Sequence, residues 1–233
     1  PKPASLRFRL SVSAAPGTEP VPAWGPRGPR DTIEFSGPEV PKWLTREIRW
    51  HSAQLAASAA YDGALHETFV DQGSAYLYLQ GLSGAVRDYV LHALALIPTR
   101  PDLARGNLRV AMRFTKSDGH IYYGSFGFGN LSDAGIRDES TDLDLFLLWG
   151  LTRYVEETRD FGFLDEIVPF ADKGESTVRD RIELAFTHLM NVTQTGPNGW
   201  IRVGTGDWSD GIILFSKDPV LTRMKGESFF NTA

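Results

Sequence analysis

The chain has 233 residues, a hydrophobic fraction of 42% and a formal net charge of −5, a balance typical of a globular domain. Acidic and basic residues are mixed and no apolar run reaches the roughly 20 residues of a membrane helix, so we expect no nucleic-acid partner and no membrane partner. Cysteine is absent, which excludes disulfides and thiolate metal sites and is consistent with a cytoplasmic protein.

The N-terminal segment predicts strands joined by an irregular connection. Apolar and polar residues alternate over residues 6–12, which is typical of a half-buried strand. Residues 13–30 are crowded with proline and glycine and are expected to be irregular. Ile33 and Phe35 indicate a short second strand.

From Pro41 onward the spacing of apolar residues predicts a mainly helical body. A first helix starts near Pro41 and is expected to turn one face inward, formed by Leu44, Ile48, His51, Leu55 and Ala59. A hairpin is expected within residues 61–73, around Asp62-Gly63 and Asp71-Gln72-Gly73.

Further helices are predicted over about residues 86–97, 101–115, 141–158, 161–168 and 176–192, with Pro98 and Pro169 as stops. The last helix is expected to bury Val178, Ile182, Phe186 and Leu189. Long loops at 61–80, 117–139 and 195–212 flank these helices, and loops of this length are usually functional. We therefore expect a site assembled from several loops.

The most informative motif is Gly204-Thr205-Gly206-Asp207-Trp208-Ser209-Asp210-Gly211, which places two carboxylates and one indole between glycines. Glycines allow tight turns and close approach to a ligand. An indole beside carboxylates can hold a sugar ring and protonate its glycosidic oxygen. The alternative is a surface turn in which an aspartate caps a helix and the tryptophan is half-buried.

Asp207-Trp208-Ser209-Asp210-Gly211 resembles the Gly-Asp-Trp-Asn-Asp-Gly signature of glycoside hydrolase family 94, the cellobiose, cellodextrin and chitobiose phosphorylases, with Ser209 in place of Asn. Other segments resemble that family in the same order. They are Arg87-Asp88, Thr141-Asp142-Leu143-Asp144-Leu145-Phe146, Arg153-Tyr154-Val155-Glu156 with Asp160, and Leu164-Asp165-Glu166. The resemblance covers about residues 41–233.

The resemblance implies a mainly α fold, an (α/α)6 toroid with the active site in its central funnel. Residues 1–40 would be the tail of a preceding β-sandwich and a linker, and residues 41–233 the N-terminal half of an incomplete toroid. Neither end of the sequence looks like a natural terminus, since it starts at Pro1 without a signal pattern and ends on an apolar segment. The remainder of the ring would come from the same protein or a partner chain, with a homodimer as a further option.

The resemblance also implies roles for particular residues. Asp210 would be the general acid. Asp207 would bind the substrate and, as a nearby carboxylate, help to keep Asp210 protonated. Trp208 would stack on a sugar ring; otherwise it is a core tryptophan.

Arg87, Asp88 and Asp142 would bind sugar hydroxyls through charge-assisted hydrogen bonds. The structural alternatives are a capping aspartate at Asp88, a surface arginine at Arg87, and a carboxylate at Asp142 that is favoured by the helix dipole alone. The histidines His51, His66, His120 and His188 show no metal-ligand pattern and are expected to be structural.

The function implied is inverting phosphorolysis of β-glucosidic bonds in an oligosaccharide or β-glucoside. No cofactor is expected beyond inorganic phosphate as co-substrate. A hydrolase or transglycosylase on the same scaffold, working without phosphate, is the main alternative. The third is an inactive sugar-binding subunit.

Overall fold

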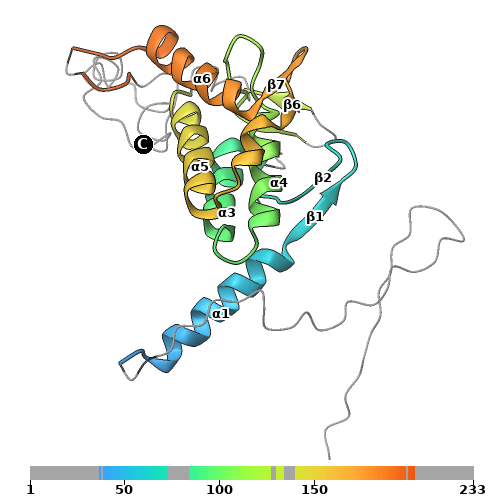
Figure 1. Ribbon diagram of the computed structural model, residues 1–233, viewed down its shortest axis with the longest axis vertical. Helices are drawn as coiled ribbons and strands as arrows, with labels where there is room; N and C mark the ends of the chain where they lie inside the picture. The colour runs from blue at the N-terminus through green and yellow to red at the C-terminus, as the bar shows by residue number, and fades with distance from the viewer. Residues whose placement is uncertain are drawn as a thin grey trace, which may run out of the picture.

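Helices make up most of the described chain in the computed structural model (Figure 1). The structure describes residues 37, 39–72, 84–126, 130–133, 140–197 and 199–202. The helices are α1 (Lys42–Ala57), α3 (Val86–Leu96), α4 (Pro101–Met112), α5 (Asp142–Thr158) and α6 (Val178–His188). The strands predicted at residues 6–12 and 33–35 lie outside the described residues, and so does the acid motif with Asp207, Trp208 and Asp210.

Short antiparallel sheets connect the helices. β1 (Ala59–Asp62) pairs with β2 (Glu67–Val70) in the hairpin that the sequence predicts. Asp62 closes its turn, because one carboxylate oxygen accepts the backbone N–H groups of Ala64 (2.7 Å) and Leu65 (2.9 Å). The other sheets are β3 (Gly84–Ala85), β4 (Gly124–Ser125) and β5 (Leu131–Ser132), and β6 (Ile167–Pro169) with β7 (Glu175–Thr177).

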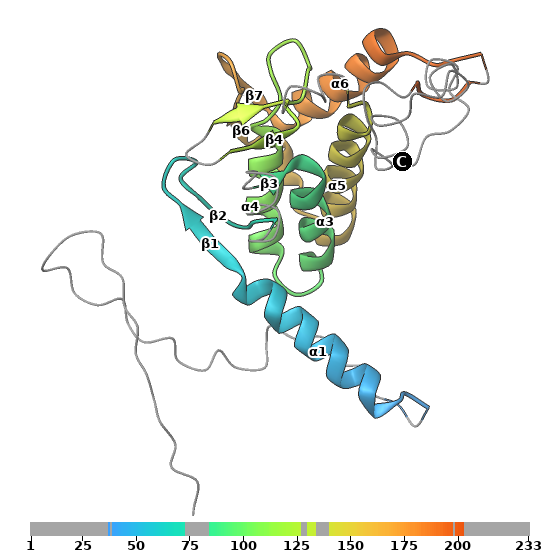
Figure 2. The same cartoon turned by 180° about the vertical axis from the view of Figure 1, so that it is seen from behind.

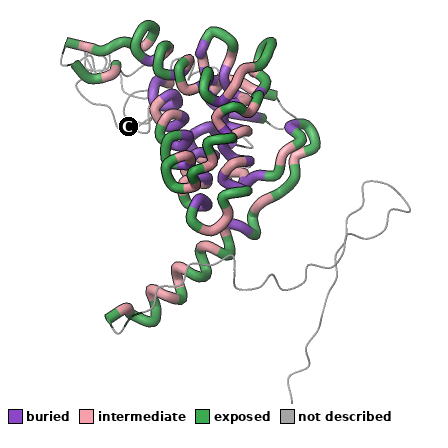
Figure 3. Tube along the Cα trace, viewed as in Figure 1, coloured by how far each residue is buried: buried purple, intermediate pink, exposed green. Residues whose placement is uncertain are grey.

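The core lies where α3, α4 and α5 pack against one another (Figure 3). Gly150 of α5 allows this contact, because a Cβ atom there would lie 2.7 Å from Val90 of α3 and 2.9 Å from Leu108 of α4. Both of these side chains are fully buried. α1 and α6 lie at opposite ends of this three-helix body (Figures 1 and 2).

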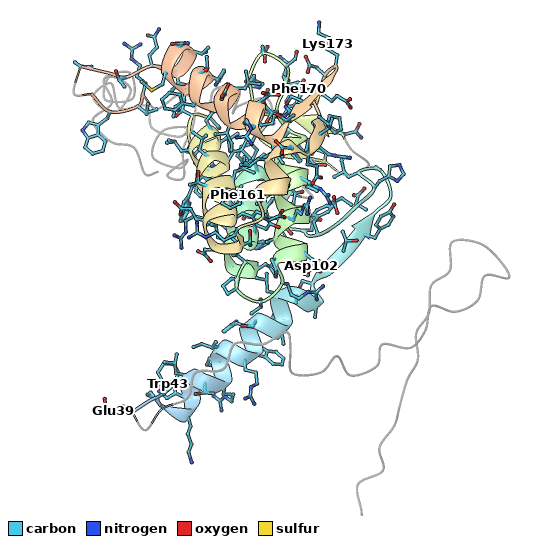
Figure 4. All side chains as sticks on the ribbon, viewed as in Figure 1. Glu39, Trp43, Asp102, Phe161, Phe170 and Lys173 are labelled. Carbon is cyan, nitrogen blue, oxygen red and sulfur yellow. The ribbon has the colours of Figure 1, made fainter. Side chains whose placement is uncertain are left out.

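α1 departs from the prediction that one face would be buried. Of its residues only Ala56 is buried, whereas Leu44, Ile48 and Leu55 are half-buried and His51 is exposed. Figure 4 shows Trp43 near the tip of α1, away from the three-helix body. The helical pattern was thus read correctly, but the described elements cover only the end of the helix next to Ala56.

The region after α5 also differs from the prediction. Residues 161–168 form a 3-10 helix, η2 (Phe161–Asp165), followed by β6, instead of one α-helix. The Asp160 carboxylate accepts the backbone N–H of Phe163 (3.3 Å) at the start of η2. After η2, residues 167–169 pair with β7 as a strand and do not continue a helix. The loop predicted at 117–139 likewise contains β4 and β5.

α6 is shorter than predicted. Its start has a capping box, in which the side chains of Thr177 and Asp180 accept each other's backbone N–H groups. After His188 it continues as a π-helix, η3 (Leu189–Thr193). Val178 and Leu189 are buried as expected, but Phe186 is 57% exposed, because no described element packs on that face.

The described helices do not close into a ring, so the structure supports the coarser description of a mainly helical fold with small antiparallel sheets. None of the helices within the described ranges is long and apolar enough to cross a membrane.

Gly150→Ala should destabilise the fold even though alanine is the better helix former. The added methyl group would clash with Val90 and Leu108, and overpacking of this kind costs about 1–3 kcal/mol. Urea unfolding of the full protein measures the change. Gly63→Ala is the matched control, since a Cβ there meets nothing within 4 Å. Equal stability of the two variants would contradict the close-packing assignment.

Candidate functional site

Three of the predicted site residues lie at the starts of two neighbouring helices. Arg87 and Asp88 are in the first turn of α3, and Asp142 is the first residue of α5. The two helices pack against each other and run side by side in Figure 2. The first turns of α3 and α5 therefore bring together residues 55 positions apart in the sequence.

Arg87 and Asp142 form a buried, bidentate ion pair. Arg87 Nε donates to Asp142 Oδ2 (2.6 Å), and Arg87 Nη2 donates to Asp142 Oδ1 (2.9 Å). The Arg87 side chain is 5% exposed and that of Asp142 is fully buried. The guanidinium also lies 5.3 Å from the centre of the Tyr123 ring, a cation–π contact. Such a fork-to-carboxylate pair fixes both the distance and the orientation of the two helix starts.

Asp88 points to a different partner. Gln72, just after β2, donates from Nε2 to Asp88 Oδ2 at 2.7 Å. Burial raises the pKa of the Asp88 carboxyl above its ordinary value, against the opposing influence of His92 and Arg87. Asp88 is therefore a half-buried acid whose protonation responds to its surroundings.

Asp71 is a second acid in the same place, and sequence reasoning placed it only in a turn. Its Oδ1 accepts the backbone N–H of Gln72 (2.8 Å) and the hydroxyl of Tyr89 (3.3 Å). Burial raises the pKa of Asp71 as well. No sequence signal distinguished Asp71 and Gln72 from ordinary turn residues, because their contacts depend on how β2 packs against α3.

Asn107 of α4 holds this segment in place. Its Oδ1 accepts the backbone N–H of Val70 (2.9 Å), and its Nδ2 donates to the carbonyl oxygens of Val70 (2.9 Å) and Tyr89 (3.2 Å). The side chain is fully buried. One amide thus ties the end of β2 to α3, where a backbone without partners would be costly.

The first turn of α5 carries a second buried carboxylate, Asp144. Its Oδ2 lies 3.0 Å from Nδ1 of His188 at the end of α6. Burial raises the pKa of Asp144, and the hydrogen bond from Asp144 raises that of His188. Among the described residues, Asp144 Oδ1 is buried with no hydrogen-bond partner. The pair connects α5 to α6, as Arg87 and Asp142 connect α3 to α5.

Three of the histidines expected to be structural have carboxylate neighbours. His188 pairs with Asp144, His120 Nε2 lies 3.1 Å from Asp133 Oδ2, and His51 Nε2 lies 3.8 Å from Glu47 Oε2 on the surface of α1. Within the part of the chain that the structure describes, no group of three histidine or carboxylate side chains could hold a metal ion. Separately, carboxylates, amides and a guanidinium gather at the starts of α3 and α5, and such groups suit hydroxyl groups.

Other residues of the family-like segments support the fold away from this site. Tyr154 donates its hydroxyl hydrogen to Asp160 Oδ2 (3.0 Å), and Arg105 donates to the same oxygen (3.2 Å). Glu166 accepts hydrogen bonds from Arg105 (2.5 Å) and from Arg109. These contacts hold η2 against α4, so the structure does not bring these residues to the α3 and α5 starts.

Arg87→Met should destabilise the protein by about 3–5 kcal/mol, because it removes the bidentate guanidinium from the buried Asp142 carboxylate. The matched control is Arg153→Met, which breaks an exposed pair with Glu157 and should cost at most about 1 kcal/mol. Denaturant unfolding of both variants measures the difference. A cost for Arg87→Met no greater than that of the control would argue against a buried pair.

The Asp144–His188 pair should make stability depend on pH. The folded pKa of His188 is raised above 6.5, so the contribution is complete below about pH 6.5 and is lost as pH rises through the folded pKa. His188→Gln should therefore lower the melting temperature more at about pH 6 than at about pH 9. His51→Gln, at an exposed position, is the control. A loss of equal size at both pH values would refute the pairing.

Comparison with known proteins agrees with the family-like motifs. Residues 64–232 match the glycosyl hydrolase 94 superfamily, catalytic domain. N,N'-diacetylchitobiose phosphorylases of Vibrio furnissii and Vibrio proteolyticus are each 32% identical over 80 residues, 34% of this chain and 10% of theirs. Solabiose phosphorylase of Paenibacillus borealis is 26% identical over 146 residues, 63% of this chain and 17% of its own. The matches thus span less than a fifth of each curated relative. The resemblance predicted from the motifs is confirmed, and the chain belongs to the glycosyl hydrolase 94 superfamily, catalytic domain.

Proposed function

We propose that this chain is part of a glycoside phosphorylase that cleaves β-glucosidic bonds with inversion. The observation that carries the proposal is the family match over residues 64–232, which includes both the helix starts with Arg87 and Asp142 and the motif with Asp210. The similar curated proteins are phosphorylases of N,N'-diacetylchitobiose and of solabiose by name. An oligosaccharide or β-glucoside is accordingly the proposed substrate.

The proposed reaction has one acid in the protein and one external nucleophile. Asp210 gives its proton to the glycosidic oxygen as the bond from that oxygen to the anomeric carbon breaks. A phosphate oxygen attacks the anomeric carbon from the opposite face, which yields a sugar 1-phosphate and a free sugar. Phosphate carries its own negative charge, so no catalytic base is needed.

Asp210 must stay protonated near neutral pH for this role. Burial or a neighbouring carboxylate raises a carboxyl pKa in this way, and Asp207 is such a neighbour in the sequence. Trp208 between them is proposed to stack on the sugar ring, where a π face meets ring C–H groups.

Asp88 is proposed to accept hydrogen bonds from sugar hydroxyls. Its position at the start of α3, its partial burial and its carboxylate chemistry support this role. Arg87 and Asp142 are proposed to contact the sugar as one unit, since each also holds the other. Their pairing supports a second role, in which the two residues hold the starts of α3 and α5 together around the sugar.

The chain is also proposed to be the N-terminal half of an (α/α)6 toroid over residues 41–233, with residues 1–40 as the tail of a β-sandwich and a linker. Large apolar side chains exposed on α5, α6 and η3 support a continuing helical body. They are Trp149, Phe186, Met190 and Val192. The rest of the same protein or a partner chain would cover them, and a homodimer is the further option.

Product analysis of the full protein tests the reaction. A sugar 1-phosphate should form only when phosphate is added, and free sugar released without phosphate would favour a hydrolase or transglycosylase instead.

Asp210→Asn should lower kcat by about 10²–10⁴-fold while sugar binding is retained. Asp165→Asn, at a position with a 75% exposed side chain, is the matched control. Sugar binding without any turnover in the unmodified protein would indicate an inactive sugar-binding subunit.

A further inference from the structure

The side-chain amide of Gln72 is held at one end only. Its Nε2 donates to Asp88 Oδ2 at 2.7 Å, and the backbone N–H of Gln72 donates to Asp71 at 2.8 Å. The amide oxygen, Gln72 Oε1, is buried and has no hydrogen-bond partner among the described residues. An amide offers both donors and acceptors, and here the acceptor oxygen is unused among the described residues.

The orientation of this amide follows from its neighbour. An ionised carboxylate only accepts hydrogen bonds, so the nitrogen of Gln72 faces Asp88 and the oxygen faces away. The segment that carries Gln72 is fixed as well, because Asn107 binds both backbone groups of Val70 two residues earlier. The contacts of Val70 with Asn107 and of the Gln72 nitrogen with Asp88 thus fix the position of Gln72 Oε1.

A buried carbonyl oxygen without a donor costs free energy, so an arrangement that keeps one points to a donor that is supplied from outside. The charges nearby restrict what that donor can be. The carboxylate of Asp88 accepts from the side-chain amide of Gln72, that of Asp71 accepts from its backbone N–H, and Arg87 is engaged with Asp142. An anion such as phosphate would be repelled here, whereas a neutral hydroxyl group would be accepted.

We infer that Gln72 is a substrate-binding residue whose Oε1 accepts a hydrogen bond from one hydroxyl of the sugar, while its Nε2 holds Asp88 for a neighbouring hydroxyl. This inference rests on the proposed function, because it takes Asp88 as part of the sugar site. Gln72 lies in the turn Asp71-Gln72-Gly73 that the sequence predicts, and the inference gives it a role in binding. It also predicts that the enzyme distinguishes sugars that lack that one hydroxyl.

Two variants separate the roles of the amide. Gln72→Lys keeps a donor toward Asp88 but has no acceptor, and Gln72→Met removes both. Each is tested in the full protein in the synthetic direction, with a free sugar as acceptor and with α-glucose 1-phosphate or one of its monodeoxy analogues, each lacking one hydroxyl, as donor. Gln72→Lys should lower kcat/KM about tenfold with the intact sugar, as expected when one buried hydrogen bond is lost. Gln72→Met should lower it further, because it also removes the contact that holds Asp88. With one particular deoxy analogue Gln72→Lys should cause no further loss, because the two changes remove the same contact.

Gln54→Lys on the exposed surface of α1 is the matched control and should leave kcat/KM unchanged. Melting temperatures close to that of the unmodified protein show that the variants fold. Losses that simply add for every deoxy analogue would overturn the inference while leaving phosphorolysis intact.

Binding of glucose and its monodeoxy analogues to the same variants, measured by calorimetry, distinguishes the role of Gln72 in sugar binding from the proposed phosphorolysis. If the unmodified protein turns over no sugar phosphate but binds glucose with the same non-additive pattern at Gln72, the inference stands and the proposed function fails. If it neither turns over the sugar phosphate nor binds glucose, both are refuted.

Discussion

The arrangement of the candidate site depends on one buried interaction, the bidentate ion pair between Arg87 and Asp142. Removing both charges from water carries a desolvation cost, and only a close, well-oriented pair offsets it. The two hydrogen bonds of 2.6 and 2.9 Å meet that requirement. Because each partner sits in the first turn of its helix, the pair sets the position of α3 against α5. Asp88, one residue from Arg87, is placed by the same constraint.

The first turn of α5 is held from two sides. Asp142 pairs with α3, and Asp144 pairs with His188 at the end of α6. Carboxylates in a first turn are favoured by the helix dipole, which partly compensates for their burial. α6 therefore crosses the end of the three-helix body where α3 and α5 begin (Figure 2). The ion pairs gather polar groups at that end, while the contacts among α3, α4 and α5 are mainly apolar.

Much of the fold was predictable because it follows from local patterns. Apolar spacing and proline positions predicted α3, α4 and α5 to within a few residues, and Asp62-Gly63 predicted the hairpin turn. Phe186 was expected inside because a helical period tells which residues share a face, but not whether anything packs on it. The end of α1 near Trp43 is uncovered for the same reason.

The candidate site was predictable only in part. Arg87, Asp88 and Asp142 were identified from a family resemblance, but neither the pairing of Arg87 with Asp142 nor the partner of Asp88 follows from spacing. Gln72 and Asn107 gave no signal, since their roles come from contacts between β2, α3 and α4. Such contacts depend on tertiary packing.

A crystal structure of the full protein with bound α-glucose 1-phosphate would test the central claim most directly. We predict a sugar ring at the starts of α3 and α5, within hydrogen-bonding distance of Asp88 and Gln72, with Asp210 facing the anomeric centre. A sugar bound elsewhere, with Asp210 directed into solvent and remote from the Arg87–Asp142 pair, would contradict it.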